Sequence, residues 1–85
     1  MSDQSGVIGR VVWSRAGRDK KRPFLIVGIA DDGKVLIADG KLRTLAKPKK
    51  KNLKHLVITD AMTDVSLFDD AAVAGYLRSY ENQAR

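Results

Sequence analysis

Three clusters of lysine and arginine are the residues of this chain best placed to do chemistry. They lie in "SRAGRDKKRPF" (residues 14–24), "GKLR" (residues 40–43) and "KPKKKNLKH" (residues 47–55). Such side chains neutralise phosphates, and arginine adds paired hydrogen bonds that lysine cannot make. The clusters predict contacts with a polyanion through their cations: Arg15, Arg18, Lys20, Lys21, Arg22, Lys41, Arg43, Lys47, Lys49, Lys50, Lys51 and Lys54.

The charge is distributed unevenly along the chain, which has 85 residues and a net charge of +6. Residues 1–56 hold 14 Lys/Arg and 5 Asp/Glu, a net +9, whereas residues 57–85 hold 2 and 5, a net −3. Segregated positive charge favours a nucleic-acid partner. The alternative is a solvated basic surface, in which the lysine run guards an exposed sheet edge.

Few residues of this chain are suited to catalysis or to metal binding. The chain has one histidine and no cysteine, which excludes the commonest nucleophile–base pairs and thiolate metal sites. Asp31, Asp32 and Asp39 fall in predicted turns, where acids commonly bind backbone N–H groups. The glycines near the start of the chain do not form a phosphate-binding loop. We therefore expect no catalytic residue, no metal and no cofactor.

The length and composition indicate one small domain with a mainly aliphatic core. Hydrophobic residues make up 44% of the chain and aromatic residues 6%. No apolar run approaches the roughly 20 residues that span a bilayer, and "MSDQSG" at the start lacks a signal-peptide pattern. We expect a soluble, cytoplasmic protein that has no membrane contact and is monomeric when free.

Apolar runs between turn signals predict a small, strongly bent antiparallel sheet or barrel. Gly33 in "DDGK" can take positive φ, and "ADGK" is a further turn signal. A turn of helix at Leu53–Leu56 anchors the lysine segment. The expected strands cover residues 7–14, 24–30, 35–38, 41–46 and 57–59, and alternation in the fourth strand puts Lys41 and Arg43 on one face.

Residues 60–85 predict a linker followed by a helix. Ser66 and Asp69 are the two candidate caps of that helix. Four side chains spaced at i, i+3, i+4 and i+7 form one helical face: Val73, Tyr76, Leu77 and Tyr80. The two tyrosines are expected to pack within this face.

Trp13 and His55 each have two candidate roles. Alternation puts Trp13 on the sheet face opposite Val12, so if Val12 is inside, Trp13 lies outside near Arg15. There it would stack on a base or a guanidinium group, whereas a core tryptophan is the alternative. His55 is either a half-buried packing residue or a binding residue.

The pattern over residues 9–29, "GRVVWSRAGRDKKRPFLIVGI", resembles the KOW motif. The motif has a glycine, alternating apolar residues, a turn glycine in a basic loop and an apolar strand. Gly9 and Gly17 stand at the family's spacing, and Val12 at a core position. This resemblance implies an RNA-binding barrel.

Further blocks resemble two related families. "NLKHLVIT" (residues 52–59) is similar to a stretch of the archaeal and eukaryotic large-subunit ribosomal protein family numbered fourteen. "AGRDK", "LIADGKLR" and "KPKKKNLKHL" (residues 16–20, 36–43 and 47–56) resemble a family of short bacterial KOW-domain RNA-binding proteins. The resemblance covers residues 7–59 and leaves the C-terminal helix outside it.

The resemblance implies a mainly β fold, a small SH3-like (KOW) barrel of about five antiparallel strands over residues 7–59, with a C-terminal α-helix within residues 60–85. Ribosomal RNA is the partner that it implies, and ribosomal proteins are further candidates. The residues that it favours as RNA-facing are Arg15, Arg18, Lys20, Arg22, Lys41, Arg43, Lys49, Lys50, Lys51, Lys54 and His55.

The sequence thus supports two functions. The first is a non-enzymatic, ribosome-associated RNA-binding module that acts in translation. The second is a protein-interaction module of the transcription or translation machinery that docks through its acidic, amphipathic C-terminal helix. We expect the helix to be structural, because a chain of 85 residues can build only a small core. DNA-binding or enzymatic roles are the least favoured.

Overall fold

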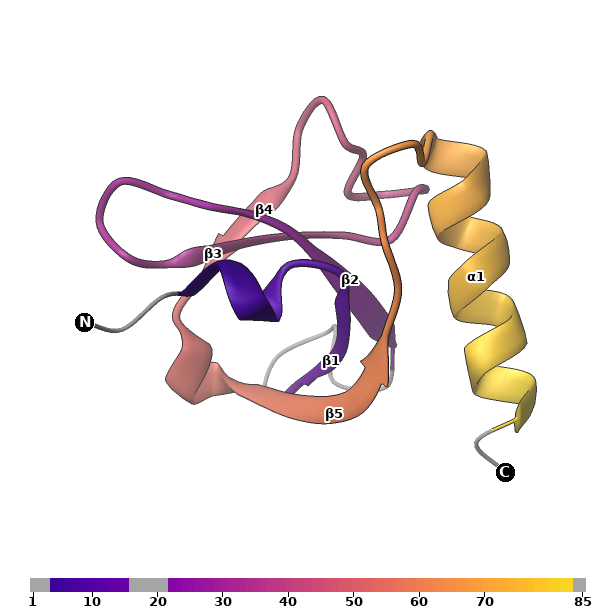
Figure 1. The fold of residues 1–85 in the computed structure, drawn as a ribbon, viewed down its shortest axis with the longest axis horizontal. Coiled ribbons are helices and arrows are strands. Elements are labelled where there is room, and N and C mark those ends of the chain that lie inside the picture. Colours follow the sequence, from indigo (N-terminus) through magenta and orange to yellow (C-terminus); the bar gives the residue numbers. More distant parts are fainter. Residues whose placement is uncertain (1–3, 16–21, 84–85) are drawn as a thin grey trace.

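The part of the chain that the structure describes forms five antiparallel strands, two short 3-10 helices and a C-terminal α-helix (Figure 1). The computed structural model describes residues 4–15 and 22–83. In chain order the elements are η1 (Gln4–Val7), β1 (Arg10–Ser14), β2 (Pro23–Ile29), β3 (Val35–Ala38), β4 (Lys49–Lys51), η2 (Leu53–His55), β5 (Leu56–Met62) and α1 (Asp70–Gln83). The sheet order is β4-β3-β2-β1-β5. The sheet curves into a small SH3-like barrel, which confirms the predicted fold class.

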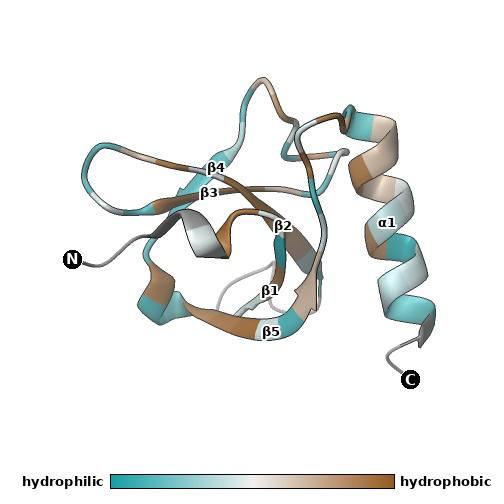
Figure 2. Ribbon diagram, viewed as in Figure 1, coloured by the Kyte–Doolittle hydropathy of each residue, from teal (hydrophilic) through white to brown (hydrophobic). Residues whose placement is uncertain are grey.

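Apolar side chains cover both faces of the central strands. One cluster fills the barrel interior: Val12, Phe24, Ile26, Val35, Ile37 and Leu56. The other lies between the sheet and α1: Val11, Leu25, Val73 and Leu77. Successive strand residues face opposite sides of a sheet. A strand covered on both faces therefore reads as a continuous apolar run, as β2 does in its brown ribbon in Figure 2.

The helix α1 begins where the sequence predicts and buries the predicted face. Asp69 is the cap, because its Oδ1 accepts the N–H of Ala72 at 2.8 Å and its carbonyl accepts the N–H of Val73 at 3.0 Å. Val73 and Leu77 are buried, and Tyr76 and Tyr80 pack around them half-buried. Among the described residues, no helix is long and apolar enough to cross a membrane.

The predicted strand over residues 41–46 is wrong. That segment has no regular structure, and the fourth strand is β4, at Lys49–Lys51. The N–H groups of Lys41 and Arg43 both donate to the carboxylate of Asp39, at 2.9 Å each. Backbone groups held by a side chain in a turn cannot join a strand ladder, so the chain passes through a loop before it pairs again.

The other predicted strands match the structure except at their ends. The chain forms η1 before β1, so the first strand begins at Arg10 instead of residue 7. The last strand continues to Met62, three residues beyond its predicted end. The turn at residues 31–34 has Gly33 at a φ of +85° as expected, and η2 is the predicted turn of helix.

We predict that Leu77→Ala lowers the free energy of unfolding by about 2–5 kcal/mol, because it leaves a cavity between α1 and the sheet. Leu77 is 4% exposed. Urea denaturation followed by circular dichroism measures the change. Leu67→Ala is the matched control, since Leu67 is 95% exposed and its truncation should stay within about 0.5 kcal/mol of zero. Equal losses in the two variants would show that α1 does not stabilise the barrel.

Candidate nucleic-acid interface

Several strand ends bring basic residues to one end of the barrel. Ser14, the last residue of β1, pairs with Leu56 at the start of β5. At the same end β2 begins, next to β1, and β3 finishes, with Leu25 opposite Ala38. The basic residues that flank these strand ends form what we call the basic rim: Arg15, Arg22, Lys41, Arg43, Lys54 and His55.

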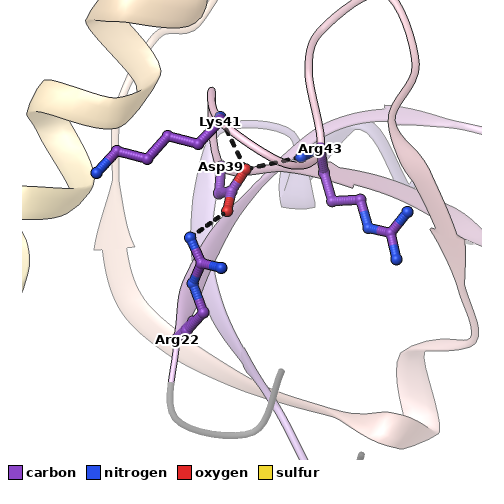
Figure 3. A network of polar contacts seen from close by, with 4 residues as sticks. All are labelled: Arg22, Asp39, Lys41 and Arg43. Atoms are coloured by element: carbon purple, nitrogen blue, oxygen red, sulfur yellow. Dashed lines mark hydrogen bonds and ion pairs between the residues drawn. The ribbon is translucent and has the colours of Figure 1, made fainter. Parts of the chain in front are cut away.

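Asp39 joins two segments of the basic rim (Figure 3). Its Oδ2 accepts a hydrogen bond from Arg22 Nη2 at 2.8 Å, so the two side chains form an ion pair. Its Oδ1 accepts the N–H groups of Lys41 and Arg43. The N–H groups of Asp39 and Gly40 in turn donate to the Arg43 carbonyl, at 2.9 and 3.1 Å. A compact turn over residues 39–43 results, tied to the residue that precedes β2.

Lys41 and Arg43 do not share a face, contrary to the prediction from strand alternation. Figure 3 shows the Lys41 side chain extended toward α1, whereas the Arg43 side chain points away from the helix. The prediction fails because the two residues lie in a turn. Lys41 therefore lines a cleft between the rim and α1, together with Arg22, Arg78 and Glu81.

Arg15, Lys54 and His55 form the other part of the rim. The Arg15 N–H donates to the carbonyl of His55 at 2.9 Å, which links the end of β1 to η2. Asn52 caps η2 through its Oδ1, which accepts the Lys54 N–H at 3.2 Å. All three side chains of this part are exposed. His55 is thus a surface residue rather than a half-buried packing residue.

The lysine run forms β4, which lies at one edge of the sheet order. Lys50 is exposed, and Lys49 and Lys51 are half-buried. Lysines on an edge strand hinder pairing with another sheet, so this placement suits the edge-guard alternative as well as phosphate contacts. Lys47, just before the strand, is also exposed.

Lys50 forms an exposed ion pair with Asp32, at 3.2 Å. The pKa of the Asp32 carboxyl lies below its usual range, mainly because it accepts the Lys34 N–H and also because Lys50 is near. About half of each side chain is exposed, 51% for Lys50 and 46% for Asp32. Exposed pairs contribute little stability, so Lys50 can exchange Asp32 for another anion at low cost.

Trp13 lies on the sheet face opposite Val12, as alternation predicts, but α1 covers that face. Its ring is half-buried, and its centroid lies 6.1 Å from that of Tyr80. Tyr76 pairs in the same way with Phe68, at 6.2 Å. The tyrosines are thus packing residues, as expected, and a contact of Trp13 with a base stays a prediction.

Three predicted site residues, Arg18, Lys20 and Lys21, lie outside the described residues, as does Gly17 of the motif. The described residues contain no group of three or more side chains suited to hold a metal ion.

Sequence reasoning missed two residues of this region. Asp39 was expected to serve only its own turn, because its contact with Arg22 depends on the pairing of β2 with β3. The Asp-Gly pair in a basic segment is the signal that could have pointed to it. Arg78 was missed because its helix lies outside the family resemblance, although it is the only lysine or arginine within α1.

The fold and the site first define a class, a small SH3-like barrel with lysine and arginine gathered at one end. No family model matches the chain, so the KOW motif stays a prediction. Over 57 residues the chain is 40% identical to "Putative ribosome-binding protein YbzG" of Bacillus subtilis, covering 67% of this chain and 77% of YbzG. The chain belongs to the same family as YbzG.

Archaeal relatives extend this similarity to the predicted ribosomal protein family. The chain is 45% identical over 53 residues to large ribosomal subunit protein eL14 of Desulfurococcus amylolyticus, and 39% identical over 59 residues to eL14 of Staphylothermus marinus. These matches cover 62% and 69% of this chain, but only 55% and 62% of the eL14 proteins. The expected kinship with a short bacterial family similar to this ribosomal protein is confirmed.

The turn over residues 39–43 rests on α1, so we predict that Gly40→Ala is strongly destabilising. Gly40 has a φ of +80°, and an added Cβ would overlap the carbonyl oxygen of Asp70 and lie 2.9 Å from the Ala74 nitrogen. We expect a loss above about 2 kcal/mol, because left-handed strain and a clash combine.

Gly33→Ala is the matched control for this variant, since Gly33 has a φ of +85° but no atom within 4 Å of an added Cβ. It should lose only the strain of the left-handed conformation, about 1–2 kcal/mol. Urea denaturation compares the two variants, and equal losses would mean that the turn does not rest on the helix.

Proposed function

We propose that this protein is a non-enzymatic RNA-binding module that associates with the ribosome through ribosomal RNA and acts in translation. The observation that carries the proposal is the gathering of the basic rim from segments far apart in the sequence. Arg15, Arg22, Arg43 and Lys54 come to one end of the barrel only because the sheet pairs their strands. The names of the relatives, a ribosome-binding protein and a large-subunit ribosomal protein, support the same partner.

The geometry of the basic rim suits recognition of the folded shape of an RNA better than recognition of its base sequence. Its cations stand on a turn, a strand end and η2, where they can reach phosphates on neighbouring strands of a folded RNA. Such contacts with the backbone recognise shape and carry little sequence information.

The alternative, docking of a protein partner through α1, loses support because the helix uses its apolar face within the molecule. Val73 and Leu77 are buried against the sheet, and Tyr80 packs on Trp13. A helix that already covers its own sheet has no second apolar face to offer. We therefore assign α1 to the stability of the barrel, and propose a monomeric, cytoplasmic protein when it is not bound to ribosomes.

We predict that Arg15→Ala, Arg43→Ala and Lys54→Ala, each made alone, weaken binding to large-subunit ribosomal RNA about fivefold at 0.15 M salt. Each variant removes one phosphate contact, so the slope of log affinity against log salt should fall by about 1. Fluorescence anisotropy with labelled RNA over a salt series measures both quantities.

Lys34→Ala is the control for these variants, because Lys34 lies in the exposed turn between β2 and β3 at the opposite end of the barrel. It should leave the affinity and the salt slope unchanged. Absence of binding by the wild-type protein, or binding that does not depend on salt, would contradict the proposed function. Equal effects of Lys34 and the rim variants would mean that net charge, and not the basic rim, drives binding.

A further inference from the structure

A buried carboxylate lies within a surface proposed to bind a polyanion. The side chain of Asp39 is only 4% exposed, whereas that of its partner Arg22 is 39% exposed. A negative charge at this place repels phosphates. It also pairs with Arg22, so one cation of the basic rim is already neutralised. If charge alone determined RNA binding, replacing Asp39 with a neutral residue would strengthen it.

The contacts of Asp39 indicate a different role. Both of its oxygens are engaged, Oδ2 by the Arg22 guanidinium and Oδ1 by the N–H groups of Lys41 and Arg43. The carboxylate thus fixes the side chain of one cation and the backbone of two others. Charge-assisted hydrogen bonds of this kind are stronger than those between neutral groups, and burial of Asp39 lowers the screening of its charge by solvent.

We infer that Asp39 is a positioning residue that makes the basic rim selective for folded RNA over flexible single strands. This inference rests on the proposed function. Binding orders long side chains at a cost of about 0.5–1.5 kcal/mol each, and groups that are already held avoid part of that cost. A folded RNA presents phosphates at fixed positions, so it binds more tightly to cations that are already held in matching positions. A flexible strand adapts to any arrangement, so it gains little from their order.

Asp32 offers an internal comparison, because it is also a turn aspartate but is more exposed than Asp39 and accepts one backbone N–H instead of two. Each aspartate sits in a turn and accepts the N–H of the residue two positions later, at 3.1 Å for Asp32 and 2.9 Å for Asp39. Each also forms an ion pair with a predicted RNA-contacting cation. Asp32 is 46% exposed and holds one backbone N–H and one exposed lysine, so its removal makes the same change in charge without releasing any residue of the basic rim.

The test compares Asp39→Ala and Asp39→Asn with Asp32→Ala and Asp32→Asn. Affinities for folded large-subunit ribosomal RNA and for unstructured poly(U) are measured at 0.15 M salt, at a temperature where circular dichroism shows each variant folded. We expect Asp39→Ala to bind the folded RNA about 3- to 10-fold more weakly, the effect of ordering one or two long side chains. Its affinity for poly(U) should stay equal or rise.

The other variants separate position from charge. Asp39→Asn keeps an oxygen for the two backbone N–H groups but loses the negative charge that pairs with Arg22, so its loss of affinity should be smaller than that of Asp39→Ala. Both Asp32 variants make the same charge change and should bind both RNAs as tightly as the wild type or more tightly. In Asp39→Asn, the Nε–Hε signal of Arg22 should show faster motion by NMR relaxation than in the wild type.

Two failures can be told apart. If the wild type binds neither RNA, the proposed function fails and this inference falls with it. If the wild type binds folded RNA but the Asp39 variants match the Asp32 variants, or bind folded RNA more tightly than the wild type, only the role of Asp39 is overturned. If Asp39→Ala does not fold, the affinities of Asp39→Asn for the two RNAs test the role of Asp39 on their own.

Discussion

Val11 and Val12 are neighbours in the sequence, and both are fully buried. Adjacent residues of a strand point to opposite sides of the sheet, so both faces must be covered. The curved barrel encloses one face, and α1 covers the other. The position of α1 then supports the turn over residues 39–43, because Asp70 in its first turn accepts the Leu45 N–H at 2.8 Å. Core packing therefore determines where part of the basic rim stands.

The elements with strong local signals were predictable from the sequence. The apolar runs of β1, β2 and β3, the glycine turn at residues 31–34, and the spacing of the helical face all appear close to their predicted places. The fourth strand was missed for a physical reason. The segment "KLRTLA" has strand-like composition, but the Asp39 side chain competes for its backbone N–H groups. Three consecutive lysines, by contrast, carry no strand signal, yet they pair with β3.

The candidate site was predictable as a list of residues but not as an arrangement. Antiparallel strands return the chain to the same end of the sheet after every second strand. Cations near residues 15, 22, 41 and 54 therefore become neighbours, while the turn with Lys34 lies at the far end. Charge counts along a sequence cannot distinguish these two ends. The contact between Arg22 and Asp39 depends on the same topology, so a pattern of local spacings could not reveal it.

The pairing of Trp13 with Tyr80 gives the molecule an intrinsic optical reporter. Trp13 is the only tryptophan of the chain, and its indole lies half-buried between β1 and α1. Indole emission shifts to longer wavelength when the ring becomes exposed to water. Undocking of the helix can therefore be followed by fluorescence without a label. A probe attached to an RNA ligand would be read at a separate wavelength, so the integrity of the barrel and the occupancy of its surface can be observed in a single sample.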